Sequence, residues 1–166
     1  MKDLLDKLSS YNIFNYLLPG VLFAVFVDEL TSFHILQHDI AVGVFVYYFL
    51  GSVISRIGSL LIEPLLRKWG IVKFAPYQDF VRASKTDPKM EILSEANNMY
   101  RTICSLMLCV GVVALYNRAY SSFPVLHTVT PVVLIVGLFS LYLLSYKKQT
   151  AYITKRIEAS SIKEQQ

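Results

Sequence analysis

Four long apolar runs alternate with polar segments along this chain. Their approximate limits are residues 13–27, 40–62, 103–116 and 128–146. A helix needs about 20 mostly apolar residues to cross the hydrocarbon core of a bilayer, and each run with its flanks reaches about that length. The pattern predicts an all-α, integral membrane four-helix bundle, with crossings at about 12–31, 40–63, 101–118 and 128–146.

A longer helix is predicted around the third run. Asp87 and Pro88 begin it, because Asp caps a helix N-terminus and Pro suits the first helical position. No further proline occurs before Pro124. We therefore predict a cytosolic helical extension within the 64–100 connection that continues through the third crossing to about Asn117, roughly 45 Å in all. In the first crossing, proline chemistry predicts a kink near residues 15–16.

Basic residues lie almost entirely on one side of the predicted crossings. Of the 16 Lys and Arg residues, only Arg118 falls on the other side, and Arg56 lies inside the second run. Short loops rich in Lys and Arg stay in the cytoplasm. This asymmetry predicts a multi-pass protein of a bacterial inner membrane, with cytoplasmic N- and C-termini.

The composition excludes an ordinary soluble domain. Apolar residues make up 54% of the chain and charged residues 17%, and the mean hydropathy is +0.46. The net charge of +4 lies beside the membrane segments, where it sets orientation and meets anionic lipid, so no direct nucleic-acid partner is expected. The 147–166 tail is predicted to be a polar helix in the cytosol. Neither this tail nor the 64–100 connection is long enough to build a second core. Residues 1–166 therefore form one four-pass domain.

Seven polar residues fall at a similar depth near the inner end of the predicted bundle. Opposed chain directions bring together Asn12, Asn15, Arg56, Glu63, Glu95, Asn98 and Arg101. Charged groups inside membrane segments are costly and usually face a bundle interior, a partner or water. We predict that this inner polar cluster has a structural or coupling role.

Arg56 has three interpretations, which the sequence leaves open. Its long side chain can reach the inner headgroups, about 9 Å away at helical rise. Alternatively, it pairs with Glu63 or Glu95 and, together with the Asn amides, fixes how the helix ends meet. The third interpretation is an ion or ligand site, the default hypothesis for a charge within a membrane.

A stripe of small residues marks the second crossing. Gly51, Ser55 and Ser59 recur every four residues, and small side chains let membrane helices approach closely. The spacing predicts a helix-packing stripe, but not whether its partner belongs to the same chain. Because four short helices make a thin bundle, we also expect a homo-oligomer.

The sequence lacks the patterns of catalytic and metal sites. It has no Gly-rich phosphate loop, no nucleophile elbow and no His-Glu-x-x-His motif. In the outer loop, His34 and His38 have the i, i+4 spacing of two metal ligands, and Asp39 follows them. A two-histidine motif without a firm third ligand is weak, and solvated side chains are the simpler interpretation. Cys104 and Cys109 fall on different helix faces, so they form neither a disulfide nor a metal pair. We expect no enzyme, no cofactor and no metal.

Three stretches carry a resemblance to known proteins: residues 11–23 (YNIFNYLLPGVLF), 54–66 (ISRIGSLLIEPLL) and 93–101 (LSEANNMYR). In these stretches, in size and in layout, the chain is similar to membrane components of anti-phage systems. Examples are accessory proteins of RNA-targeting CRISPR loci and the membrane subunit of Kiwa. The resemblance implies a non-enzymatic membrane partner or effector and assigns no catalytic residue.

The function expected from these features is a non-enzymatic, self-associating inner-membrane module in phage defence. It would sense or perturb the membrane, or recruit a cytosolic protein. The expected partners are therefore the lipid bilayer and a cytosolic protein. Two alternatives stay open. One is a small channel or transporter in which the inner polar cluster lines a vestibule. The other is a passive membrane anchor or assembly factor.

Overall fold

The computed structural model describes residues 13–161, so Asn12 lies outside the described residues. Helices account for 86% of them, and residues 13–161 contain no strand. Two elements, labelled η, are single π-helical turns. In chain order the elements are η1 (Ile13–Leu17), α2 (Leu18–Leu30), α3 (Ile40–Ile57), η2 (Gly58–Ile62), α4 (Glu63–Lys68), α5 (Tyr77–Thr86), α6 (Lys89–Ser122) and α7 (Val125–Ser161).

Four helical stretches are long and apolar enough to cross a membrane. They are Ile13–Leu30, Ile40–Lys68, Lys89–Ser122 and Val125–Ala159. The predicted all-α architecture with four crossing-length helices is thereby confirmed. At 34 and 37 residues, α6 and α7 are about 51 and 55 Å long, against about 30 Å for a hydrocarbon core. Both helices therefore extend well beyond a bilayer.

The long third helix starts as predicted and ends slightly later. Pro88 holds the N-cap position, and the Asp87 carboxylate just before it accepts a hydrogen bond from the Lys89 backbone N–H at 2.9 Å. The helix then continues without interruption past Asn117 and ends one turn later. It ends there because Phe123 precedes Pro124 and takes an extended conformation, which proline imposes on the residue before it.

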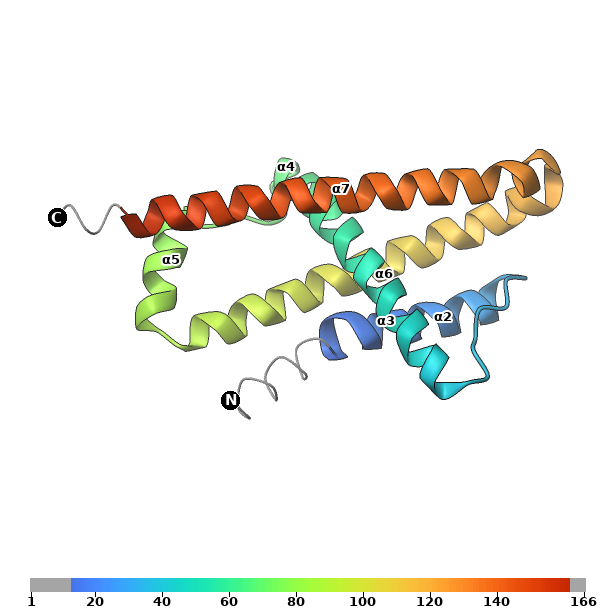
Figure 1. Cartoon of the computed structure of the whole chain (residues 1–166), viewed down its shortest axis with the longest axis horizontal. Coiled ribbons are helices and arrows are strands. Elements are labelled where there is room, and N and C mark those ends of the chain that lie inside the picture. The colour runs from blue at the N-terminus through green and yellow to red at the C-terminus, as the bar shows by residue number, and fades with distance from the viewer. Residues whose placement is uncertain (1–12, 162–166) are drawn as a thin grey trace.

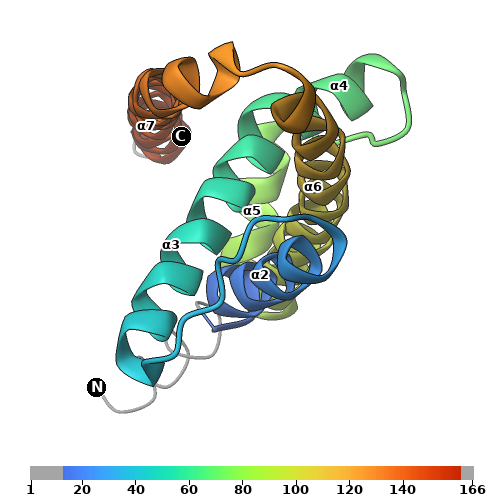
Figure 2. The same cartoon turned by 90° about the vertical axis from the view of Figure 1, so that its right-hand side faces the viewer.

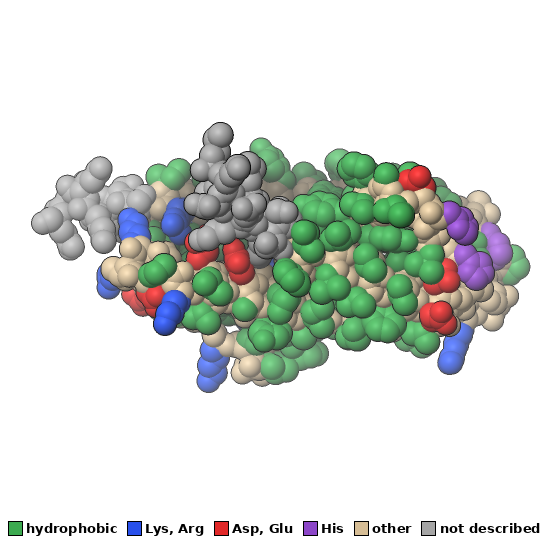
Figure 3. Space-filling model, turned by 90° about the horizontal axis from the view of Figure 1, so that it is seen from below, with side chains coloured by type: hydrophobic (Ala, Val, Ile, Leu, Met, Phe, Trp, Pro, Cys, Tyr) green, Lys and Arg blue, Asp and Glu red, His purple; other side chains and the backbone are tan. Residues whose placement is uncertain are grey.

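The surface divides into an apolar band and two polar ends. Figure 3 shows Lys and Arg side chains gathered toward one end, the three histidines at the other, and hydrophobic side chains between them. We call the end that holds α5 and the C-terminal part of α7 the basic end (Figure 1). The opposite end, with His34, His38 and His127, is the histidine end. This distribution is the one expected of a protein that spans a bilayer.

Both π-helical turns lie just ahead of a proline. The turn η1 ends two residues before Pro19, and η2 ends two residues before Pro64. Proline lacks an N–H and its ring clashes with the carbonyl four residues back, so the hydrogen-bond ladder widens there. In η2 the Glu63 N–H donates to the Gly58 carbonyl, five residues earlier. The kink expected near residues 15–16 thus takes the form of the π turn η1.

The closest helix contact joins α2 and α3. A Cβ on Gly20 would lie 1.7 Å from the Tyr47 carbonyl oxygen, and a Cβ on Gly51 would lie 1.7 Å from the Tyr16 carbonyl oxygen. No side chain fits at either position, so the two backbones touch directly. The predicted small-residue stripe, with Gly51 at its start, therefore packs within this chain.

The remaining core is small and one helix stands outside it. On α3 and α6, Ile54, Leu106 and Val110 form the buried apolar centre. Helix α7 packs against α3 and α5 and lies apart from α2 (Figure 2). Only 6% of its membrane-length window is buried, compared with 22–28% for the other three. Most of the apolar surface of α7 therefore faces outward from the three-helix core.

Candidate functional site

A buried hydrogen-bonded group joins the first three crossing helices toward the basic end. The Thr102 hydroxyl lies 3.2 Å from Asn15 Oδ1 and 3.3 Å from Ser55 Oγ, and 2.8 Å from the Asn98 carbonyl oxygen, its shortest contact. Asn15 and Thr102 are almost completely buried. Ser105, one turn further along α6, donates to the Ile54 carbonyl at 2.9 Å.

The geometry of this group matters more than its strength. Interhelical hydrogen bonds in membranes contribute about 0.6 kcal/mol on average, with a maximum near 1.7. An unpaired amide or hydroxyl in an apolar interior costs more than that. The Asn15, Ser55 and Thr102 side chains therefore fix the rotation of three helices relative to one another, because other rotations would leave them unsatisfied.

An ionic group lies beside this network. The Arg101 Nη1 atom is 2.7 Å from Glu63 Oε2, and the Lys148 Nζ atom is 3.7 Å from Glu63 Oε1. Glu63 is buried, with 8% of its surface exposed, although it opens the short helix α4. One carboxylate thus links α4 to both α6 and α7, the two helices that extend beyond the bilayer.

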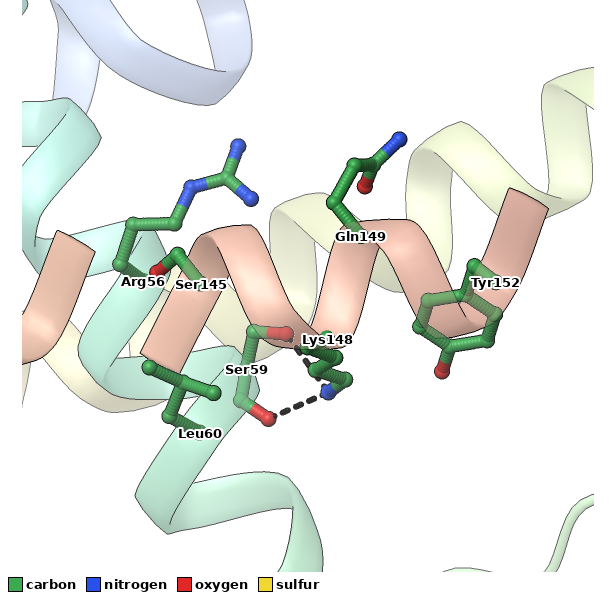
Figure 4. A pocket seen from close by; sticks show the side chains of 7 residues that line it. All are labelled: Arg56, Ser59, Leu60, Ser145, Lys148, Gln149 and Tyr152. Carbon is green, nitrogen blue, oxygen red and sulfur yellow. Dashed lines mark hydrogen bonds between the residues drawn. The ribbon is translucent and has the colours of Figure 1, made fainter. Parts of the chain in front are cut away.

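Lys148 also supplies a backbone hydrogen bond that is missing next to Pro64. Its Nζ donates to the Ser59 carbonyl at 2.6 Å and lies 2.8 Å from Ser59 Oγ (Figure 4). The usual α-helical donor to Ser59, the Glu63 N–H, is engaged by Gly58 in the π turn. The donor at π spacing would be residue 64, a proline without an N–H. The ammonium group therefore serves a carbonyl that the helix itself does not satisfy.

Arg56 takes a partner other than the expected one. Its Nη2 atom donates to the Tyr16 hydroxyl at 3.3 Å, whereas Glu63 is held by Arg101 and Lys148. Of the three interpretations left open for Arg56, the pairing with Glu63 or Glu95 is not formed among residues 13–161. The π turn η2 lies between residues 56 and 63 and changes the helix face on which the carboxylate projects.

The structure brings together part of the predicted inner polar cluster. Asn15 and Asn98 meet through Thr102, and Glu63 meets Arg101. Glu95 is half-buried and makes no ion pair among residues 13–161. Within the small-residue stripe, Ser55 joins the buried network and Ser59 binds Lys148.

Sequence reasoning missed the contribution of α7. Its polar contacts toward the basic end come from Tyr142, whose hydroxyl lies 2.7 Å from Ser52 Oγ, and from Lys148 and Tyr152 further along. A signal was present, since Tyr142, Ser145, Lys148 or Gln149 and Tyr152 recur every three or four residues. Such spacing places them on one polar face of a helix whose other positions are mostly apolar.

A cavity opens beside Lys148, between η2 and α7. Its space for water-sized groups is about 30 Å³, and its lining residues are Arg56, Ser59, Leu60, Ser145, Lys148, Gln149 and Tyr152 (Figure 4). The surrounding charges are unequal, because Arg56 and Lys148 line the cavity without an acidic side chain from the described part of the chain, and the Glu63 carboxylate that binds Lys148 also binds Arg101. In addition, the buried Nε atom of Arg101 has no hydrogen-bond partner among residues 13–161. The cavity is therefore electropositive.

The polar side chains of the histidine end make local contacts. His34 Nδ1 lies 3.4 Å from Asp28 Oδ1, and the His127 ring stacks on Tyr120 with centroids 4.1 Å apart. Asp39 caps α3 by accepting from the Val42 N–H at 2.8 Å. Among residues 13–161 no three His, Cys, Asp or Glu side chains group closely enough to hold a metal ion.

Four crossing-length helices, an apolar band and charged ends define a multi-pass membrane protein. No family model, no curated protein and no solved structure matches the chain. The polar and ionic groups at its basic end are the residues on which a functional hypothesis can rest.

Proposed function

We propose that this protein is a non-enzymatic, self-associating module of a bacterial inner membrane that acts in phage defence. In this proposal a cytosolic partner or a change in the bilayer acts on the basic end. The module then passes the change to its crossings and perturbs the membrane. The resemblance of the 11–23, 54–66 and 93–101 stretches to membrane components of anti-phage systems supports the pathway.

The observation that carries the proposal is the position of Glu63. Its carboxylate binds Arg101 on α6 and Lys148 on α7, and both helices continue from there beyond the bilayer. Breaking a buried ion pair by removing one partner costs about 3–5 kcal/mol, so the pair resists independent movement of the helices it joins. A force or ligand on the helical extensions would therefore be felt at the crossings.

Two further features support the orientation and the self-association. The basic end carries most of the Lys and Arg residues, which favours its placement in the cytoplasm together with both termini. The outward face of α7 is apolar over many turns and barely covered within one chain. A second copy can cover this face as well as lipid can.

The test is the substitution Glu63→Gln. It removes the anion shared by Arg101 and Lys148 while keeping the size of the side chain. We expect cells that express the variant to lose the depolarisation produced by the unaltered protein, measured with a voltage-sensitive dye at matched protein levels. We also expect a changed oligomer size in detergent, measured by light scattering.

Glu95→Gln is the matched control, because it removes the same charge from α6 without breaking an ion pair in the described part of the chain. It should leave both readouts unchanged. If Glu63→Gln also leaves depolarisation and oligomer size unaltered, the ionic group has no part in the mechanism.

A small channel or transporter is the second candidate, favoured by the cavity at the basic end. Against it, the path toward the histidine end meets the buried apolar side chains Leu106 and Val110. Flux of ions or small solutes through liposomes that contain only the purified protein separates the two. Selective flux without any partner favours the channel.

A further inference from the structure

The cavity between η2 and α7 presents hydrogen-bond donors with capacity to spare. Arg56 has five N–H donors, and the Tyr16 hydroxyl occupies one of them. The Tyr152 hydroxyl and the Gln149 amide make no side-chain hydrogen bond within residues 13–161, although the Tyr152 ring packs on Tyr77. The cavity is thus built for a group that accepts several hydrogen bonds at once.

The charge of the surroundings specifies an anion. Arg56 and Lys148 line the cavity and no acidic side chain of residues 13–161 does; Glu63, the ion-pair partner of Lys148, is shared with Arg101. Charge without a counterion is costly where water is scarce, and an anionic ligand relieves that cost. Phosphate oxygens accept charge-assisted hydrogen bonds from both Arg and Lys.

The size of the cavity limits the ligand to a small group. Its space for water-sized groups is about 30 Å³, far below the range of about 300–1,000 Å³ typical of pockets for drug-sized molecules. Such a space can receive the phosphate oxygens of a headgroup, whereas the remainder of a larger molecule must lie outside. The neighbouring surface suits an acyl chain, because the exposed Leu61 follows the lining residue Leu60 and the exposed Leu144 precedes Lys148 by one turn.

The position of the cavity matches the level of lipid phosphates. Lys148 follows the apolar run of α7, and Lys147 and Tyr146 beside it are exposed. Tyr, Lys and Arg concentrate at the membrane interface, and basic pockets between membrane helices bind anionic headgroups. Because only 6% of the membrane-length window of α7 is buried and the helix stands outside the core, its flank is open to the bilayer (Figure 2).

We propose that this cavity binds the phosphate of an anionic phospholipid headgroup, with Arg56 and Lys148 as its charged contacts. The proposal goes beyond the signalling role above and needs only that the four helices span a bilayer. Bound lipid would add an anion to the junction of α3, η2 and α7, so α7 would hold its place against the core more firmly when the lipid is present.

The experiment uses the full chain, purified in detergent and stripped of lipid. Binding of phosphatidylglycerol and of phosphatidylcholine is measured by native mass spectrometry at equal lipid concentrations. We expect phosphatidylglycerol to bind at least about tenfold more tightly, because the excess positive charge repels the choline ammonium. Equal binding of the two lipids would overturn the proposal.

Charge-removing variants locate the site. Arg56→Gln and Lys148→Gln should each weaken phosphatidylglycerol binding about tenfold, the loss expected for one charge-assisted hydrogen bond. Lys147→Gln is the matched control, since it removes one charge from an exposed neighbour on the same helix, and it should change binding less than about twofold. A loss with Lys147→Gln as large as with the other two means general attraction to the surface and contradicts the assignment.

Two further arms keep the test decisive. Lys148→Arg restores the charge and should restore most of the affinity, which separates a binding role from damage to the fold. Inorganic phosphate, added without lipid, should raise the unfolding temperature much less than phosphatidylglycerol does. An equal rise would show a free anion site and would overturn the assignment to lipid.

Discussion

At the residue scale, two glycines determine how closely the first two crossing helices approach. Gly20 and Gly51 each face a backbone carbonyl of the other helix, at a distance that leaves no room for a methyl group. This contact brings η1 and α3 close enough for the Asn15 and Ser55 side chains to reach Thr102. The buried network therefore depends on the two glycines, whose lack of a side chain permits this close approach.

Alanine at either glycine should weaken the fold. Gly51→Ala places a Cβ 1.7 Å from the Tyr16 carbonyl oxygen, so the helices must separate. We expect a loss of about 1–3 kcal/mol, as for other overpacked positions, seen as a lower unfolding temperature in detergent. Gly137→Ala is the control, because nothing lies within 4 Å of its Cβ position, and it should be neutral or slightly stabilising. Similar effects of the two substitutions would argue against direct backbone contact between η1 and α3.

The sequence identified individual polar residues better than their partners. Asn15, Ser55, Glu63 and Arg101 stand out because polar groups are rare in apolar runs, and all four make interhelical contacts. Lys148 did not stand out, because a lysine just after an apolar run is what an ordinary membrane boundary shows. The partner of a side chain depends on the rotation of each helix about its own axis. The sequence pattern does not determine this rotation closely enough to identify the partner.

At the element scale, the π turn before Pro64 explains why α3 and α7 meet where they do. The turn moves the Glu63 N–H onto Gly58, and the proline supplies no replacement donor for the Ser59 carbonyl. Lys148 from α7 supplies it instead. The irregular turn η2 thus provides the carbonyl to which α7 binds through Lys148.

A double-mutant cycle tests this dependence. Pro64→Ala restores the missing N–H and lets the ladder return to α-helical spacing, so the Ser59 carbonyl no longer needs Lys148. The destabilisation caused by Lys148→Gln should then be smaller in the Pro64→Ala background, with a coupling energy of about 1 kcal/mol measured by thermal unfolding. The pair Pro64→Ala and Lys147→Gln should be additive within about 0.5 kcal/mol. Additivity of the first pair as well would mean that Lys148 acts through Glu63 alone.

At the scale of the whole molecule, the protein is a three-helix core with a fourth helix on its flank. The core consists of η1 with α2, α3 with η2, and α6, whereas α7 contacts it through one polar face. Both long helices extend past the apolar band at the basic end, where α5 packs against them (Figure 1). The helices therefore extend beyond the apolar band at the basic end, whereas loops form the histidine end.

The two ends should be reachable from opposite sides of the membrane. In a parent with Cys104 and Cys109 replaced by Ser, His38→Cys introduces an exposed thiol at the histidine end and Lys155→Cys one at the basic end. If the basic end is cytoplasmic, an impermeant maleimide will label His38→Cys in intact cells and Lys155→Cys only after permeabilisation. The cysteine-free parent is the control for background. Labelling of both variants in intact cells would contradict the orientation.

The sequence by itself determined the number of crossing-length helices, the extent of α6 and the helical course of α7. These features depend on apolar run length, on prolines and on caps, and each of them acts over a few neighbouring residues. The π turns before Pro19 and Pro64 were not predicted as such, because the form of the irregularity depends on how the neighbouring helices satisfy the freed carbonyls.

Only the tertiary structure decided which polar groups meet. Interhelical contacts depend on the rotation, tilt and spacing of whole helices, and an inserted π-helical residue turns every later side chain to a new face. For that reason Glu63 faces Arg101 and Lys148, while Arg56 faces Tyr16. The chain specifies its helices through local chemistry, and it specifies its candidate site through the packing of those helices.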